Sequence, residues 1–157
     1  MTPSAEYDYC FNTLPQFSNH VIGTSDWISI GQDRIDVFAE CTEDHQWIYT
    51  DSDRASRESP YGGTIAQGFL PLTLLSAMQR DAGLVPHDVR HVLSCGIERM
   101  RLVTPVKAGA RLRARVELLD VRTLDADRVR ILTRNTIESD TSAEPVMTAD
   151  VEMELHR

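Results

Sequence analysis

The polar stretch from Asp44 to Asp51, which reads DHQWIYTD, holds side chains of the types that enzymes use for acid–base chemistry. A carboxylate such as Asp44 can take up and return a proton, and the amide of Gln46 can hold a water molecule beside it. A tyrosine phenol ordinarily titrates at about 10, so at pH 7 Tyr49 is expected to donate a hydrogen bond or a proton and to be a poor general base. These residue types indicate a candidate site for proton transfer with Asp44 as the base.

Each of these residues also has a simpler interpretation. A lone aspartate more often ends a helix or starts a turn. Tyr49 can equally be an aromatic side chain that fills a pocket without catalytic function. His45 is of a residue type that often acts as a base, but a partly exposed loop histidine is its simpler interpretation. The residue types alone therefore leave both interpretations open.

A glycine-rich turn, GGTIAQG, follows downstream. Because Pro71 is tolerated only in the first turn of a helix, we expect a helix to begin near Gln67 or Gly68. The N–H groups of Gly68, Phe69 and Leu70 then have no partner inside the helix and lie at the positive end of its dipole. Such an end suits a developing oxyanion, and Gly68 has no side chain to shield its N–H. Alternatively, the glycines only let the chain turn into a buried helix.

The helix itself is apolar nearly all round, since no charged residue occurs from Ile65 to Met78. Such a helix is a buried one, and it is too short to cross a bilayer, which needs about 20 apolar residues. Long strand-like segments follow it, with alternating apolar and polar side chains, over residues 89–103, 111–118, 129–137 and 147–155. One buried helix followed by consecutive strands predicts an α+β fold in which the sheet wraps the helix.

The segments upstream of the helix are shorter. We expect an N-terminal arm over residues 1–20, packed through Tyr7, Tyr9, Phe11 and Phe17, and a single domain over residues 21–157. Residues 25–30 suggest a short strand, 32–42 an amphipathic helix, and 51–57 a second short helix with Asp51 as its N-cap. Residues 81–88 are expected to form a loop.

The motif DHQWIYTD followed by GTIAQGFL resembles the signature of the MaoC-like, (R)-specific enoyl-CoA hydratases, in particular their NodN-like branch. The pattern of that branch is D-H-Q-W-I-H-x-D and then G-x-T-I-A-H-G-F-L. Similarity begins near Gln32 and extends through Gly109. Two positions depart from the pattern, because Tyr49 replaces the catalytic histidine and Gln67 replaces the histidine before the helix glycine.

The resemblance implies a hot-dog fold, a homodimer, and a hydratase or dehydratase acting on 2-enoyl or 3-hydroxyacyl thioesters of coenzyme A or an acyl carrier protein. No cofactor is implied. The catalytic residues it implies are Asp44, Tyr49 and Gly68, with the Gly68 N–H polarising the thioester carbonyl. The expected substrate-binding residues are Gln46, Gly63, Gln67 and Thr73, although the Thr73 hydroxyl can instead bond its own helix backbone.

Two other functions stay open because tyrosine is a weaker base than histidine. The same pocket could direct an amine or an intramolecular hydroxyl to the β-carbon of an enoyl thioester, giving conjugate addition or cyclisation. A third possibility is a catalytically silent subunit that binds an acyl carrier or completes a heteromer.

Composition narrows the remaining classes. The 157 residues fit one domain, and the net charge of −8 with a pI near 5.0 argues against nucleic-acid binding. Cys10, Cys41 and Cys95 lack the spacing of a zinc site or a disulfide framework, so we expect no metal site. With no apolar run of spanning length and no signal peptide, we expect a cytoplasmic protein without membrane contact. The alternating arginines at 111, 113 and 115 fit a solvated strand face better than a phosphate clamp.

Overall fold

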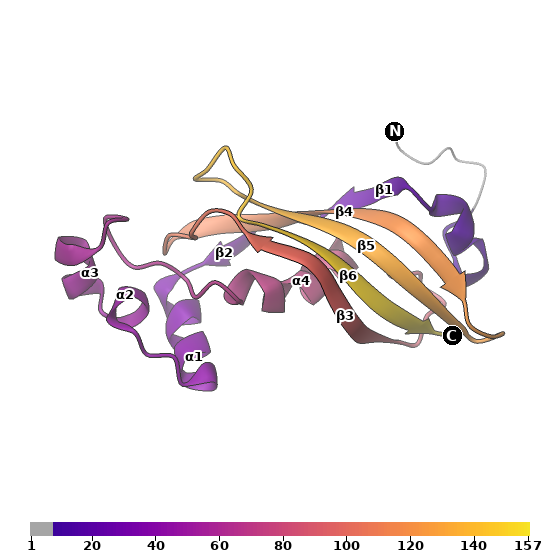
Figure 1. Cartoon of the computed structure of the whole chain (residues 1–157), viewed down its shortest axis with the longest axis horizontal. Helices are drawn as coiled ribbons and strands as arrows, with labels where there is room; N and C mark the ends of the chain where they lie inside the picture. Colours follow the sequence, from indigo (N-terminus) through magenta and orange to yellow (C-terminus); the bar gives the residue numbers. More distant parts are fainter. Residues whose placement is uncertain (1–7) are drawn as a thin grey trace.

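The computed structural model describes residues 8–157, so the beginning of the predicted arm, including Tyr7, lies outside the described residues. The described chain forms one antiparallel sheet in the order β1-β4-β5-β6-β3, with β2 also paired to β4 (Figure 1). The strands are β1 (His20–Thr24), β2 (Ile28–Ile30), β3 (His91–Leu102), β4 (Ala110–Thr123), β5 (Arg128–Ser139) and β6 (Met147–His156). The four long strands that the sequence predicts are therefore confirmed.

The alternation along β4 explains how the sheet separates core from solvent. Its apolar side chains are buried, while the arginines between them lie on the opposite face. There Arg111 pairs with Asp140 at 2.8 Å and Arg113 pairs with Glu138 at 2.9 Å. These arginines thus form the solvated strand face that the sequence predicts.

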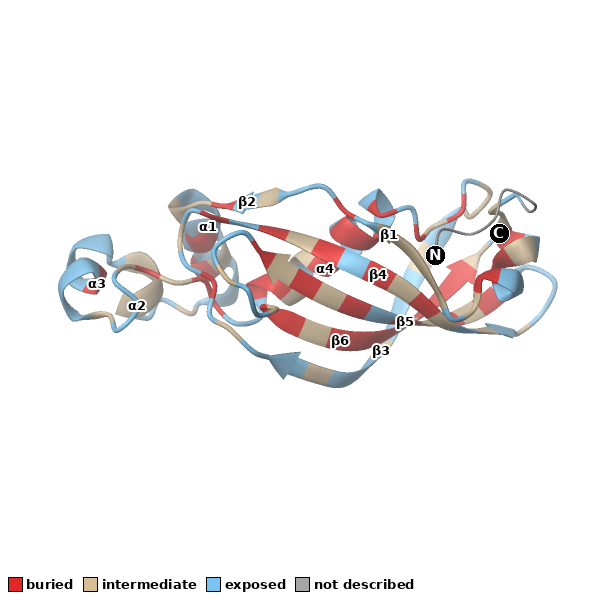
Figure 2. Ribbon diagram, turned by 90° about the horizontal axis from the view of Figure 1, so that it is seen from above, coloured by how far each residue is buried: buried red, intermediate tan, exposed pale blue. Residues whose placement is uncertain are grey.

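Helix α4 (Leu70–Asp81) packs against the sheet, as the predicted α+β arrangement requires (Figures 1 and 2). Leu70, Leu75 and Met78 are buried against the strands, and the buried Gln79 amide donates to Asn135 Oδ1 at 3.0 Å. Figure 2 shows buried residues recurring along β4, β5 and β6. None of the described helices is long and apolar enough to span a membrane.

Two expectations for α4 are wrong in detail. The helix begins at Leu70 and not at Gln67 or Gly68, because Ile65 is held in a strand-like bridge with Lys107. The chain then makes a turn that is closed by the Leu70 N–H donating to the Gln67 carbonyl at 3.0 Å. Pro71 follows within the first helical turn, where proline is tolerated. The helix is also not covered on all sides, because the sheet packs against one side only. On the other side three small residues are exposed: Thr73, Ser76 and Ala77.

Three short helices extend beyond one end of the sheet: α1 (Gln32–Thr42), α2 (Trp47–Thr50) and α3 (Ser52–Glu58) (Figure 1). The predicted helix over residues 32–42 is confirmed by α1. The predicted cap of α3 is confirmed too, because the Arg54 N–H donates to Asp51 Oδ1 at 2.9 Å. Helix α2 and strand β1 are not predicted, since four residues are too few for a helical period and Gly23 interrupts β1.

The described part of the predicted arm packs against the body of the protein. It forms a 3₁₀ helix, η1 (Phe11–Phe17), that buries Phe11, Leu14 and Phe17. The Tyr9 hydroxyl donates to the Leu84 carbonyl at 2.6 Å, and burial raises the pKa of this phenol well above its usual value.

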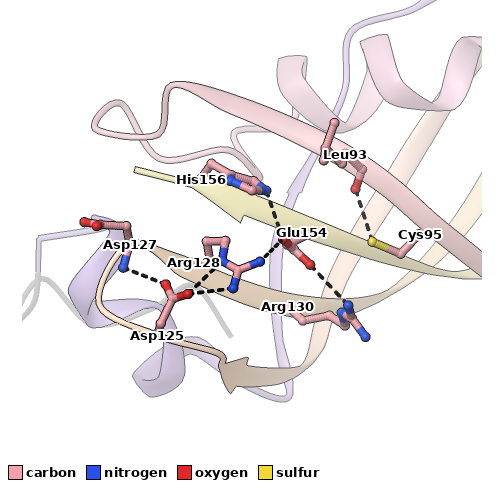
Figure 3. A network of polar contacts seen from close by, with 8 residues as sticks. All are labelled: Leu93, Cys95, Asp125, Asp127, Arg128, Arg130, Glu154 and His156. Atoms are coloured by element: carbon pink, nitrogen blue, oxygen red, sulfur yellow. Dashed lines mark hydrogen bonds and ion pairs between the residues drawn. The ribbon is translucent and has the colours of Figure 1, made fainter.

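A network of ion pairs joins β5 and β6 at the end of the sheet opposite α1–α3 (Figures 1 and 3). Glu154 lies at its centre, 3.1 Å from the Arg130 guanidinium, 3.4 Å from that of Arg128 and 3.0 Å from His156 Nε2. The hydrogen bond from Arg130 is the main cause that lowers the pKa of Glu154, and the charge of Arg128 adds to it. This network is remote from the pocket described next and contributes to stability.

Candidate active site

Three backbone hydrogen bonds place the glycine-rich turn beside α2 and beside the loop that precedes β4. The Ile65 N–H donates to the Ile48 carbonyl at 3.1 Å, and the Ala66 N–H donates to the Val106 carbonyl at 2.8 Å. A third bond runs from the Ala108 N–H to the Thr64 carbonyl at 3.0 Å. The chain between Thr64 and Ala66 is thus held on both sides, and Gln67 and Gly68 follow at a fixed position.

A mainly apolar pocket of about 230 Å³ opens at this turn. It brings together Tyr49 from α2, Gln67 and Gly68 from the turn, and Pro71 from α4. The rest of its wall consists of Ile65, Ala66, Leu102, Val103, Thr104, Pro105, Val106 and Val146. None of these wall residues is among the predicted site residues, although the family resemblance extends over Pro105 and Val106.

Gly68 offers an open N–H at the pocket. Within residues 8–157, the N–H groups of Gly68 and Phe69 donate to no backbone or side-chain acceptor, whereas the Leu70 N–H is used by the turn. The expectation of three free N–H groups is therefore wrong for Leu70. A Cβ atom on residue 68 would lie 2.8 Å from Leu102 Cδ1, so the absence of a side chain keeps both the donor and the space open.

Asp44 and Gln46 lie together and do not line the pocket, but the charge of Asp44 acts on the Tyr49 phenol. The Gln46 amide donates to Asp44 Oδ1 at 3.0 Å. The pKa of Tyr49 is raised above its usual value, first by burial of the phenol and then by the negative charge of Asp44. The phenol consequently stays protonated at neutral pH.

Gln67 carries an unusual polar atom in the pocket wall. Its side chain is only 3% exposed, and its Nε2 donates to the Ile35 carbonyl at 3.3 Å. The other end of the amide, Oε1, is buried and has no hydrogen-bond partner within the described residues. A buried acceptor without a donor is costly, so this amide oxygen lowers the stability of the folded chain.

Three other candidates lie outside the pocket wall. Gly63 is half-buried in the turn, upstream of the residues that line the pocket. The Thr73 hydroxyl donates to the Leu70 carbonyl at 2.8 Å, which is the bond to its own helix backbone. His45 is exposed and lies 3.6 Å from Glu40 Oε1, as a loop histidine would. Among residues 8–157 no group of three or more histidine, cysteine or acidic residues is placed to hold a metal ion.

The antiparallel sheet packed on α4 and the pocket at the start of that helix define a hot-dog domain with a candidate acid–base site. Residues 16–140 match the family model described as the MaoC like domain. The chain therefore belongs to the MaoC-like dehydratase family, as the two sequence motifs indicate.

Individual relatives agree with this assignment. The chain is 38% identical to Nodulation protein N of Rhizobium leguminosarum bv. viciae, over 87% of this chain and 85% of that protein. It is 37% identical to 3-hydroxyacyl-thioester dehydratase Z of Mycobacterium tuberculosis, over 82% of this chain and 84% of that protein. Among solved structures, the unliganded R-hydratase PhaJ1 of Pseudomonas aeruginosa aligns with a TM-score of 0.63 and 26% identity, covering 83% of this chain and 79% of that one.

Proposed function

We propose that the protein is a hydratase or dehydratase of acyl thioesters, acting on 2-enoyl or 3-hydroxyacyl groups carried by coenzyme A or an acyl carrier protein. The observation that carries the proposal is the pocket that joins the open Gly68 N–H to the protonated Tyr49 phenol. The names of a 3-hydroxyacyl-thioester dehydratase and an R-hydratase among its relatives support this substrate class.

In the proposed reaction the Gly68 N–H donates to the thioester carbonyl and stabilises the negative charge that develops on its oxygen. During dehydration, Asp44 removes the proton from C2, and Tyr49 donates its proton to the leaving hydroxyl at C3, which departs as water. The proton on Asp44 then passes to the Tyr49 phenolate and restores both groups. Hydration follows the same steps in reverse, with Gln46 orienting Asp44.

The direct test is to incubate the purified chain alone with a panel of enoyl and 3-hydroxyacyl thioesters of different chain length. We expect reversible hydration, with loss of the enoyl absorbance and formation of the 3-hydroxyacyl product. No turnover of any thioester by the folded protein, combined with measurable binding of one of them, would contradict the proposal and favour a silent carrier-binding subunit.

We further propose a homodimer that forms through strand β3. This strand lies at the edge of the sheet, and its apolar side chains Leu93 and Ile97 are 51% and 48% exposed. Leu102, Val103 and Phe69 extend the same exposed apolar set up to the pocket. An unpaired apolar edge strand is a site for pairing with another chain, and a second copy presents the matching edge.

Light scattering of the purified protein tests the dimer, with twice the chain mass of 17.7 kDa expected. Ile97→Lys should reduce the mass to that of one chain. Val37→Lys, which adds the same charge at a 69% exposed apolar position on α1, is the matched control and should leave the dimer intact. A monomeric wild-type protein would contradict the homodimer.

The proposed substrates suggest a cytoplasmic location, and the three cysteines are all free, as in a reducing compartment. Cell fractionation tests this, and recovery of the protein in an oxidising compartment would contradict it.

A further inference from the structure

Gln32, the first residue of α1, makes three side-chain hydrogen bonds: one within its own helix and two to other segments, namely α2 and the glycine-rich turn. Its Nε2 donates to the Tyr49 carbonyl at 2.6 Å and to Asp36 Oδ1 at 2.8 Å, and its Oε1 accepts the hydroxyl of Thr64. We infer that Gln32 is a positioning residue for the reaction, fixing Tyr49 and the glycine-rich turn relative to each other. This inference rests on the proposed function.

The bond to Tyr49 matters because α2 is only four residues long. So short a helix does not persist without tertiary contacts, and its last carbonyl groups lack partners inside the helix. No backbone N–H of the described chain donates to the Tyr49 carbonyl outside regular helical bonds, and Gln32 supplies a donor there. The backbone that carries the phenol is thereby tied to the first turn of α1.

The bond from Thr64 ties the other half of the site to the same amide. Thr64 is buried and begins the segment that reaches Gly68 four residues later. A buried hydroxyl needs an acceptor, and Gln32 Oε1 provides it. The backbone carbonyl of Thr64 already accepts a hydrogen bond from the Ala108 N–H, so Thr64 is fixed at both its main chain and its side chain.

The chemistry of the amide explains why glutamine fits this position. The side chain at residue 32 must donate to the Tyr49 carbonyl and at the same time accept from the Thr64 hydroxyl. Asp36 accepts the second N–H of the amide and so fixes its orientation. A carboxylate at residue 32 would place an acceptor against the Tyr49 carbonyl. Leucine, of similar shape, would remove all three bonds.

The experiment compares Gln32→Leu, Thr64→Val, Tyr49→Phe and the double variant Gln32→Leu/Tyr49→Phe in the full chain, using hydration of crotonyl-CoA. Gln16→Leu, an exposed glutamine on η1, is the matched control. We expect Gln32→Leu to lower kcat roughly 10- to 100-fold with a smaller change in KM, because misplacement by about 1 Å costs that much. Thr64→Val should also lower kcat, but by a smaller factor than Gln32→Leu.

The double variant separates positioning from general damage. If Gln32 acts through Tyr49, adding Gln32→Leu to Tyr49→Phe should lower kcat less than twofold further. Losses that multiply in the double variant would overturn the inference, as would a folded Gln32→Leu protein with the kcat of Gln16→Leu.

Hydrogen exchange gives a second readout that needs no activity. Gln32→Leu should speed exchange at residues 46–51 and 64–69 while leaving the β4–β6 amides unchanged. An exchange rate that increases uniformly along the chain, or that does not change at residues 46–51 and 64–69, would overturn the inference even if no thioester is turned over. Absence of wild-type turnover together with the localised exchange change would instead contradict only the proposed function.

Discussion

Gly68 and Leu102 meet across the mouth of the pocket, since a Cβ atom on residue 68 would lie 2.8 Å from Leu102 Cδ1. The two residues come from the turn before α4 and from the end of β3. A side chain at residue 68 would therefore both shield the N–H group of that residue and reduce the volume of the pocket.

Replacing Gly68 by alanine should therefore push the flexible Leu102 side chain and narrow the pocket. We expect Gly68→Ala to lower kcat/KM for crotonyl-CoA about 10-fold or more, with Tm changed little because the residue is exposed. The double variant Gly68→Ala/Leu102→Ala removes the clash and should recover part of the loss. Activity of Gly68→Ala equal to wild type would show that the pocket mouth is not used.

The raised pKa of Tyr49 gives a prediction for the pH dependence of the reaction. A phenol whose pKa lies above its usual value of about 10 is almost wholly protonated up to about pH 9, so it remains a proton donor there. We expect kcat to show no fall from Tyr49 titration between about pH 7 and 9, and Tyr49→Phe to lower kcat by about 10²-fold or more.

Tyr49→His provides the comparison for this prediction. If it hydrates crotonyl-CoA faster than wild type, the wild-type phenol is adapted to a nucleophile other than water. If Tyr49→Phe keeps the wild-type rate, the phenol has no role as a donor.

The unpartnered Gln67 Oε1 predicts a separation between stability and activity. Gln67→Leu removes a buried acceptor without a donor, so the free energy of unfolding should stay the same or rise, although the Ile35 carbonyl loses its donor. If Gln67 binds the substrate, as the family resemblance implies, the KM for 3-hydroxyacyl thioesters should increase. An unchanged KM in Gln67→Leu would contradict a substrate-binding role.

The Glu154 network predicts how stability changes with pH. The pKa of Glu154 is lower in the folded chain than its ordinary value of 4.5, mainly through the hydrogen bond from Arg130. The folded state is therefore stabilised fully above pH 4.5, and this contribution is lost as the pH falls through the lower, folded pKa. Denaturant unfolding should show Glu154→Gln less stable than wild type at pH 7, with the difference shrinking below pH 4.5. Glu144→Gln, at an exposed loop position, should show no such pH dependence.

Regular periodicity made much of the fold predictable. The strands β3 to β6 and helix α1 follow from alternation and helical spacing, and the Asp51 cap follows from its residue type. By contrast, β1 contains Gly23 and lacks alternation, and its backbone is held by pairing with β4, a contact far along the chain. The predicted start of α4 is too early, because the bridge between Ile65 and Lys107 keeps the residues before the helix extended.

The candidate site was predictable only where a motif is contiguous. Asp44, Gln46, Tyr49 and Gly68 stand in two short motifs; Tyr49 and Gly68 line one pocket, whereas Asp44 and Gln46 are bonded to each other outside its wall. The wall from Leu102 to Val106 and the bonds of Gln32 join residues that are distant in sequence, so local patterns carry no signal for them. The roles of these residues stay predictions until the variants are measured.

The central claim, that Asp44 transfers the proton at C2 in a thioester hydratase, is tested most directly by the rate of crotonyl-CoA hydration in wild type and Asp44→Asn. Asparagine keeps the size of the side chain and can hydrogen-bond to Gln46 but cannot take up a proton. We expect wild-type turnover and a decrease in kcat of about 10²- to 10⁴-fold in Asp44→Asn, with equal Tm. A folded Asp44→Asn protein that hydrates crotonyl-CoA as fast as wild type would contradict the account.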